Sequence, residues 1–183
     1  MADTRWRVTE SSYAIETPFL RLRKDTIALP DGHVIADYFV RESRGFVVIC
    51  AVTPQNEIVL VHQYKHGIGR EILELPAGAI DPDESPHDCA VRELREETGY
   101  TAPQMQFVRS FIVEPTNSNT IAHLFVALDA RKTSEQDLDV TEQIAVELVP
   151  SARVREWLRD GTLDCMPHVA ALYLLWDLGI LSP

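Results

Sequence analysis

The sequence lacks any long hydrophobic run, and none follows its first residues, Met1–Arg7. A helix needs about 20 consecutive apolar residues to cross a bilayer, so we expect no transmembrane segment and no membrane partner. A secretory signal peptide needs an apolar stretch near the N-terminus, and we expect none here.

Positive charge is also scarce. The chain has 17 Lys and Arg residues against 28 Asp and Glu, and its formal net charge is −11. Proteins that bind duplex nucleic acid carry basic patches, so this composition excludes duplex nucleic acid as the expected partner. A phosphorylated substrate would need a local cation to be bound.

Cysteine is rare as well. Cys50, Cys89 and Cys165 are widely spaced, and they form no CxxC or zinc-finger pattern. This favours a reduced, cytoplasmic setting. There is no internal repeat or linker, and 183 residues suit one domain, so we expect a single domain over residues 1–183.

What is abundant is carboxylate, and it is concentrated in one stretch. Glu93, Glu96 and Glu97 fall on one face of a predicted helix. Like charges at this spacing oppose helix formation unless a cation lies among them. Three close carboxylates are the oxygen ligands that Mg²⁺ or Mn²⁺ prefers. The same helix also has an apolar face, which includes Val91 and Leu94 and which we expect to pack on a core.

The ends of this helix are marked in the sequence. Ser85 followed by Pro86 is a typical start, because a hydroxyl caps the first turn and proline fits the first helical position. Gly99 is a typical end, because the residue after a helix often adopts positive φ. We expect a helix of about three and a half turns between them.

Hydrophobic periodicity predicts the other elements. Residues 1–14 show no clear period, which favours a loosely ordered terminus, although Trp6, Arg7 and Tyr13 could reach a partner. The polar segment 129–143 is predicted to be an exposed, functional loop. Two further helices are expected from residue 151 to about 159 and from 166 to 178. The predicted strands are 19–29, 33–41, 46–52, 57–64, 71–75, 104–113, 121–128 and 144–149.

The stretch beginning at Gly78 resembles the Nudix hydrolase signature at every specified position. After Gly78 come five residues, Glu84, seven residues, and then RELREETGY, which ends at Tyr100. The flanking segments VLVHQYKH and EILELPAG, and Pro115 fifteen residues beyond Tyr100, are similar to the ADP-ribose pyrophosphatase branch of that family.

The resemblance implies a Nudix-type α/β/α sandwich with a mixed sheet and an N-terminal antiparallel hairpin. It implies hydrolysis of the pyrophosphate bond of ADP-ribose or a related nucleoside diphosphate sugar, with Mg²⁺ or Mn²⁺ as cofactor. It also implies a homodimer, with the N-terminal extension of residues 1–42 as a possible dimerisation element. The hairpin near residues 19–41 is the candidate for a contribution to the partner's site. Two alternatives stay open: another substrate (GDP-mannose, a nucleoside triphosphate or a dinucleoside polyphosphate), or a catalytically weak regulator that binds nucleotides.

The resemblance also implies roles for residues. The metal ligands would be Glu93, Glu96, Glu97 and the backbone carbonyl of Ala77, with Glu96 shared between ions and counted among the catalytic groups. Arg92 would orient the glutamates by ion pairing rather than exchange a proton, because a guanidinium keeps its charge.

The base is expected on the loop before the last strand. The branch often carries two glutamates there, separated by one residue. Glu142 matches the second, but Val140 occupies the first, and the adjacent Asp139 could compensate. A solvated loop acid is the alternative interpretation of Glu142.

Four residues are the expected substrate contacts. Lys65 stands where the branch often has arginine and would hold a phosphate as a point charge. Arg44 and Arg70 are further cations, and Glu74 would bond a ribose or base edge or pair with a nearby arginine. The loop PTNSNT lacks the Gly and Glu often found in strict ADP-ribose hydrolases, which keeps the wider class of nucleotide sugars open.

Overall fold

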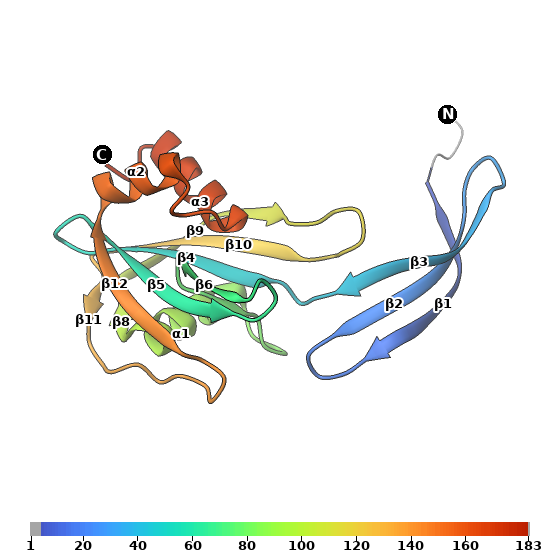
Figure 1. Cartoon of the computed structure of the whole chain (residues 1–183), viewed down its shortest axis with the longest axis horizontal. Helices are drawn as coiled ribbons and strands as arrows, with labels where there is room; N and C mark the ends of the chain where they lie inside the picture. Colours follow the sequence, from blue (N-terminus) through green and yellow to red (C-terminus); the bar gives the residue numbers. More distant parts are fainter. Residues whose placement is uncertain (1–4, 183) are drawn as a thin grey trace. The chain divides into compact units, whose positions relative to one another are not determined.

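A computed structural model of the chain describes residues 5–182 (Figure 1). The chain divides into two compact units. The smaller comprises residues 1–45 and 112–121, and the larger comprises 46–111 and 122–183. Predictions that concern residues 1–4 lie outside the described residues.

The smaller unit is a three-stranded antiparallel sheet of β1 (Arg7–Glu16), β2 (Arg21–Ala28) and β3 (Val34–Glu42). The predicted hairpin is confirmed as β2 and β3. The prediction of a loosely ordered terminus was wrong for β1. Every residue of β1 is exposed, so its sequence carries no alternation that would have indicated a strand.

This sheet has little apolar interior of its own. Among its described residues, Ile27 is the buried hydrophobic side chain. Asp25 is also buried, and the Arg23 guanidinium donates to both of its carboxylate oxygens, at 2.9 and 3.0 Å. Hydrogen bonding from Arg23 holds the pKa of Asp25 below its usual range. Ion pairing rather than apolar packing therefore fixes the middle of this sheet.

The larger unit contains a mixed sheet of seven strands in the order β12-β5-β4-β10-β9, with β6 beside β5 and β7 beside β4. β10 pairs with β4 in parallel, and β4 pairs with β5 and with β7 in antiparallel orientation. A mixed sheet was predicted, and it is confirmed. The strands are β4 (Phe46–Val52), β5 (Glu57–Lys65), β6 (Arg70–Glu74), β7 (Ala77–Ala79), β9 (Gln104–Ile112), β10 (Ile121–Leu128) and β12 (Ile144–Pro150), and β8 (Tyr100–Thr101) pairs separately with β11 (Arg131–Lys132).

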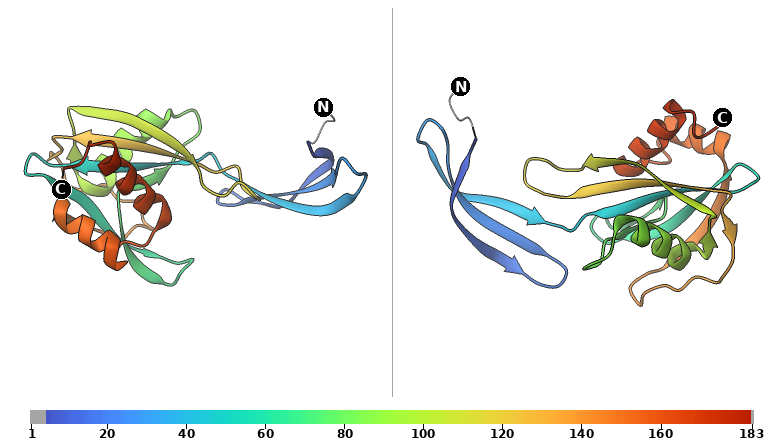
Figure 2. Two further views of the ribbon diagram at one scale, coloured as in Figure 1. Left: turned by 90° about the horizontal axis from the view of Figure 1, so that it is seen from above. Right: turned by 180° about the vertical axis from the view of Figure 1, so that it is seen from behind.

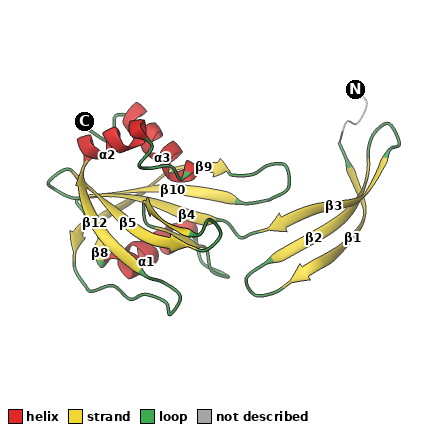
Figure 3. Cartoon of the chain, viewed as in Figure 1, coloured by secondary structure: helices red, strands yellow, loops and turns green. Residues whose placement is uncertain are grey.

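Three helices cover the sheet, as Figures 2 and 3 show. α1 (Pro86–Thr98) lies on one face, and α2 (Ser151–Asp160) and α3 (Met166–Asp177) lie on the other. Their buried apolar residues belong to two separate clusters, one on each face. The predicted α/β/α layering is therefore confirmed.

The central strand β4 divides its side chains between these clusters. Val47, Ile49 and Ala51 pack on the α1 side, whereas Val48 and Cys50 pack on the side of α2 and α3. Successive residues of a strand point to opposite faces, so a strand buried on both sides must be apolar throughout.

The ends of α1 follow the sequence signals. The Ser85 hydroxyl accepts a hydrogen bond from the Asp88 amide at 3.1 Å, and Gly99 has φ of 74°. One detail of the predicted helix was wrong: Val91 is exposed, and Cys89 is buried in its place. The buried stripe therefore lies closer to Ala90 and Leu94 than the pattern indicated. Within residues 5–182, no helix is long and apolar enough to span a bilayer.

Candidate metal centre and active site

Two glutamates of α1 face the short strand β7. The Ala77 amide donates a hydrogen bond to the Glu97 carboxylate at 3.0 Å. A methyl group built on Gly78 would lie 1.9 Å from the Glu93 carboxyl carbon. The backbone of β7 therefore approaches both carboxylates closely, and a side chain at position 78 would occupy the space that the Glu93 carboxylate takes.

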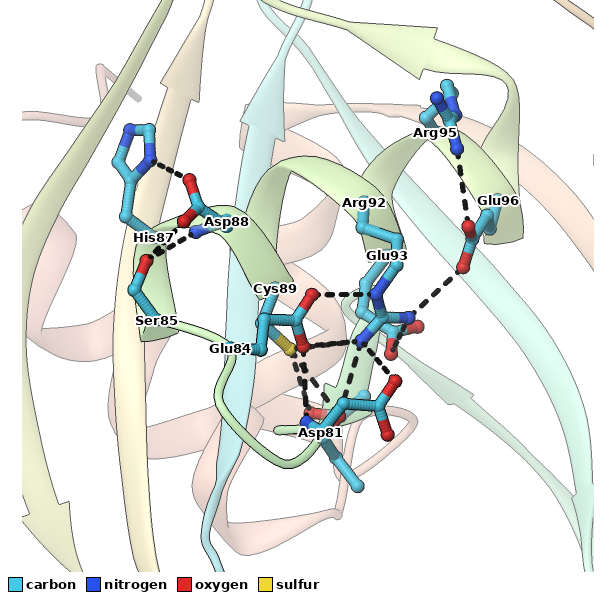
Figure 4. Close-up of polar contacts among 12 residues, drawn as sticks. Asp81, Glu84, Ser85, His87, Asp88, Cys89, Arg92, Glu93, Arg95 and Glu96 are labelled. Atoms are coloured by element: carbon cyan, nitrogen blue, oxygen red, sulfur yellow. Dashed lines mark hydrogen bonds and ion pairs between the residues drawn. The ribbon is translucent and has the colours of Figure 1, made fainter.

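Arg92 donates hydrogen bonds to three carboxylates, and its guanidinium lies 3.9 Å from a fourth, that of Asp81 (Figure 4). Its guanidinium donates to both oxygens of Glu84, at 2.8 and 2.9 Å. It also donates to Glu93 at 2.7 Å and to Glu96 at 3.0 Å. The hydrogen bond from Arg92 lowers the pKa of Glu84 to about 2. The arginine thus fixes Glu93 and Glu96 in position, with Glu84 anchoring the arginine itself.

Glu93 and Glu97 are buried, with exposed fractions of 8% and 3%. Burial raises the pKa of Glu97 to about 8, and it also raises the pKa of Glu93. Arg92 bonds Glu93, whereas Glu97 receives a hydrogen bond from a neutral backbone amide. Oxygen donors that are crowded, buried and short of positive charge fit a divalent cation.

A cavity of about 190 Å³ opens beside this cluster. Two loop residues on its wall hold each other: the Glu142 amide donates to the Asp139 carbonyl at 2.9 Å, and the Asp139 amide donates to the Glu142 carboxylate at 3.1 Å. Val140, at the tip of this turn, is fully exposed. The cavity therefore brings the predicted base to the predicted metal ligands. It is lined by Arg92, Glu93, Glu96, Asp137, Leu138, Asp139 and Glu142.

Lys65 and Glu74 form an ion pair, with Nζ and Oε1 2.5 Å apart. The other Glu74 oxygen lies 3.3 Å from Nε2 of the buried His168. His168 and Cys165, together with Glu74, are close enough to share a metal ion. However, His168 Nδ1 accepts the Leu75 amide at 3.2 Å, so the imidazole proton resides on Nε2 and faces Glu74. This hydrogen bonding favours a fixed polar chain over a second metal site.

Arg70 and Arg44, the remaining predicted contacts, are not among the residues that line the cavity. Arg70 forms an ion pair with Asp164. Arg44 is exposed and belongs to the smaller unit. Sequence reasoning missed the contact of His168 with Glu74 and the position of Asp137 on the cavity wall. An apolar stripe of histidine and leucine carries no signal of a polar partner on another strand.

Comparison with known proteins agrees with this geometry. The family description "NUDIX domain" matches residues 42–169, and "Nucleoside diphosphate sugar hydrolase N-terminal domain" matches residues 6–40. The chain belongs to the Nudix hydrolase family. Nudix hydrolases generally use divalent metal ions, in keeping with the carboxylates of α1.

This Nudix hydrolase is similar to several proteins of known name, in sequence or in structure. It is 38% identical to the methanol dehydrogenase activator of Bacillus methanolicus, over 85% of this chain and 84% of that protein. It is 33% identical to an ADP-ribose pyrophosphatase of Bacillus subtilis (strain 168), over 71% of this chain and 75% of that protein. A solved structure of an ADP compounds hydrolase shares the fold, with a TM-score of 0.84, 22% identity, and coverage of 95% and 94%.

Replacement of Gly78 by alanine tests the close approach of β7 to Glu93. Because the clashing atoms end a flexible side chain, the fold should tolerate the methyl group while Glu93 is displaced. We expect Mn²⁺ affinity to fall by about 10- to 100-fold, with a nearly unchanged melting temperature. Gly67→Ala is the control, because a methyl group there contacts nothing. Equal Mn²⁺ affinity in the two variants, measured by titration calorimetry, would contradict this geometry.

The raised pKa of Glu97 predicts a pH effect on the metal-free protein. In the folded state its pKa rises from 4.5 to about 8, so its contribution to stability is complete below the unfolded value and is lost as pH rises through about 8. In EDTA, the melting temperature should fall between about pH 7 and 8.5 by more than it does in Glu97→Gln. The same fall in both proteins would show that Glu97 does not titrate in this range.

Proposed function

We propose that the protein hydrolyses the pyrophosphate bond of ADP-ribose or a related nucleoside diphosphate sugar, giving a nucleoside monophosphate and a sugar phosphate. The observation that carries this proposal is the cavity in which Glu93, Glu96 and Glu142 converge. The relatives named as ADP-ribose pyrophosphatases support the choice of substrate.

The cation would be Mg²⁺ or Mn²⁺, held by Glu93, Glu96 and Glu97 with the Ala77 carbonyl. When bound, it supplies positive charge that offsets the repulsion between these carboxylates and a diphosphate. Arg92 contributes by holding two of the ligands, Glu93 and Glu96, in fixed directions.

Proton transfer is assigned to Glu142. Its carboxylate lines the cavity, and its contact with the Asp139 amide orients it. A carboxylate in this position can accept a proton from an attacking water. Val140, where the related enzymes often have a glutamate, is fully exposed to solvent. We therefore assign proton transfer to Glu142 alone.

Lys65 is assigned to a substrate phosphate, as a point charge held by Glu74. Glu74 in turn is fixed by His168. Arg44 and Arg70 stay secondary assignments, and the pairing of Arg70 with Asp164 makes it the weaker one.

The direct test is a substrate panel with Mg²⁺, comparing ADP-ribose, other nucleoside diphosphate sugars, GDP-mannose, nucleoside triphosphates and dinucleoside polyphosphates. Released nucleoside monophosphate is measured by chromatography. We expect the highest kcat/KM for ADP-ribose or another ADP-sugar. Preference for a nucleoside triphosphate would overturn the substrate assignment.

Glu142→Gln should lower kcat by about 100- to 10,000-fold with little change in KM, because it removes the base but keeps the shape of the side chain. Steady-state kinetics on ADP-ribose measure both constants. Glu135→Gln is the matched control, since it makes the same change at an exposed position of the same segment. Activity of Glu142→Gln within about threefold of the unchanged protein would rule out this base.

A second candidate function is regulation of another enzyme. The similarity to a methanol dehydrogenase activator favours it, over most of both chains. Tight nucleotide binding without turnover of any compound in the panel would support this alternative. Hydrolysis at a kcat near the usual range for enzymes, about 1 s⁻¹ or more, would favour the enzyme.

We also propose a homodimer formed through the smaller unit, in the cytoplasm. The free state of all three cysteines supports a reducing compartment. β1 exposes large apolar side chains, among them Val8, Tyr13 and Ile15, on a sheet with little interior of its own. Light scattering should give about twice the chain mass of 20.7 kDa. Val8→Lys should then shift the mass toward one chain, and a monomeric unchanged protein would contradict the dimer.

A further inference from the structure

The last turn of α1 is bonded to the segment that precedes the Glu142 turn. The final carbonyl groups of a helix have no partner within the helix and must find one elsewhere. Here the Asp137 amide donates to the Glu96 carbonyl at 2.9 Å, and the Thr133 amide donates to the Gly99 carbonyl at 2.9 Å. The segment therefore supplies the C-terminal cap of the helix that carries the predicted metal ligands.

One side chain completes this cap. The Gln136 amide nitrogen donates to the Glu97 carbonyl at 2.6 Å and to the Ile144 carbonyl at 3.1 Å. Both partners are carbonyl oxygens, which only accept hydrogen bonds, so the NH₂ group must face them. A primary amide has two N–H hydrogens, and each has its own acceptor here.

The two acceptors lie at functionally different places. Glu97 belongs to α1, and Ile144 begins β12 directly after the Glu142 turn. Gln136 therefore joins the helix to both ends of segment 137–143. Within that segment, Asp139 and Glu142 form hydrogen bonds to each other. Since the turn is self-contained, its place over the cavity depends on where its two ends are held.

We propose that Gln136 is a positioning residue that holds the Glu142 turn against the carboxylates of α1. The proposal rests on the proposed function, in which Glu142 is the base. Gln136 itself is absent from the cavity wall, so it acts through the segment that it anchors. Its loss should misplace the base without removing a ligand of the metal or a contact of the substrate.

Three substitutions separate hydrogen bonding from side-chain size. Gln136→Met keeps the length but removes both donors. Gln136→Glu places carboxylate oxygens against two carbonyl oxygens, and these like-charged acceptors repel one another. Gln136→Lys restores N–H donors and places a positive charge at the C-terminal end of α1, where a cation is favourable. Gln143→Met is the matched control, because it makes the same change at an exposed position of the same loop.

With ADP-ribose and Mg²⁺, we expect kcat to fall at least about 10-fold in Gln136→Met and further in Gln136→Glu, with KM and Mn²⁺ affinity within about twofold. Gln136→Lys should recover most of the lost kcat, and Gln143→Met should lose none. A role confined to stability would lower the melting temperature and leave kcat unchanged. An unchanged kcat in Gln136→Met, or a Lys variant no better than the Met variant, would overturn the proposal.

Hydrogen exchange tests the anchor without turnover. The amides of residues 138–143 should exchange faster in Gln136→Met than in the unchanged protein or Gln143→Met. Because this readout needs no substrate, it distinguishes the two failures. A protein inactive on ADP-ribose and on every other nucleoside diphosphate sugar of the panel would refute the proposed function, whereas unchanged exchange in Gln136→Met would refute the anchor itself.

Discussion

Two carboxylates with almost no access to water, Glu93 and Glu97, constrain the rest of the larger unit. Burying such groups without a partner is costly, so each must be compensated by hydrogen bonds, by a cation or by taking up a proton. Arg92 compensates Glu93 only in part, and Glu97 receives only the weaker hydrogen bond of a backbone amide. The raised pKa of Glu97 records this deficit, and a divalent cation would remove it.

The packing around α1 keeps these two carboxylates buried and incompletely compensated. α1 is fixed on the sheet by an apolar stripe that packs on alternate residues of β4. The backbone of β7, which pairs with β4, lies close to the two carboxylates. The end of α1 is closed by the segment leading to Glu142, and Gly99 permits this because a methyl group there would lie 2.2 Å from the Ser134 carbonyl oxygen. Core packing, the proposed metal site and the placement of the proposed base thus depend on the same helix.

Much of this could be predicted from the sequence where the cause is local. Ser85 and Gly99 mark the helix because caps act within a few residues, and the apolar run of β4 indicates a buried strand because both of its faces are covered. β1 could not be found, since a strand exposed at every position has no burial pattern. The anchoring by Gln136 could not be found either, because its partners are backbone carbonyls, which every residue has. The pairing of Glu74 with His168 joins β6 to α3 across 94 positions of sequence, and only the fold brings them together.

We propose that the carboxylates of α1 form a site that releases protons when a divalent cation binds. Titration calorimetry with Mn²⁺ at about pH 7, in two buffers of different ionisation enthalpy, measures the protons released on binding. Because the pKa of Glu97 is about 8 in the metal-free protein, we expect release of about one proton per chain, decreasing as the pH is raised above that value. Mn²⁺ binding with no proton release at pH 7, or no binding at all, would contradict it.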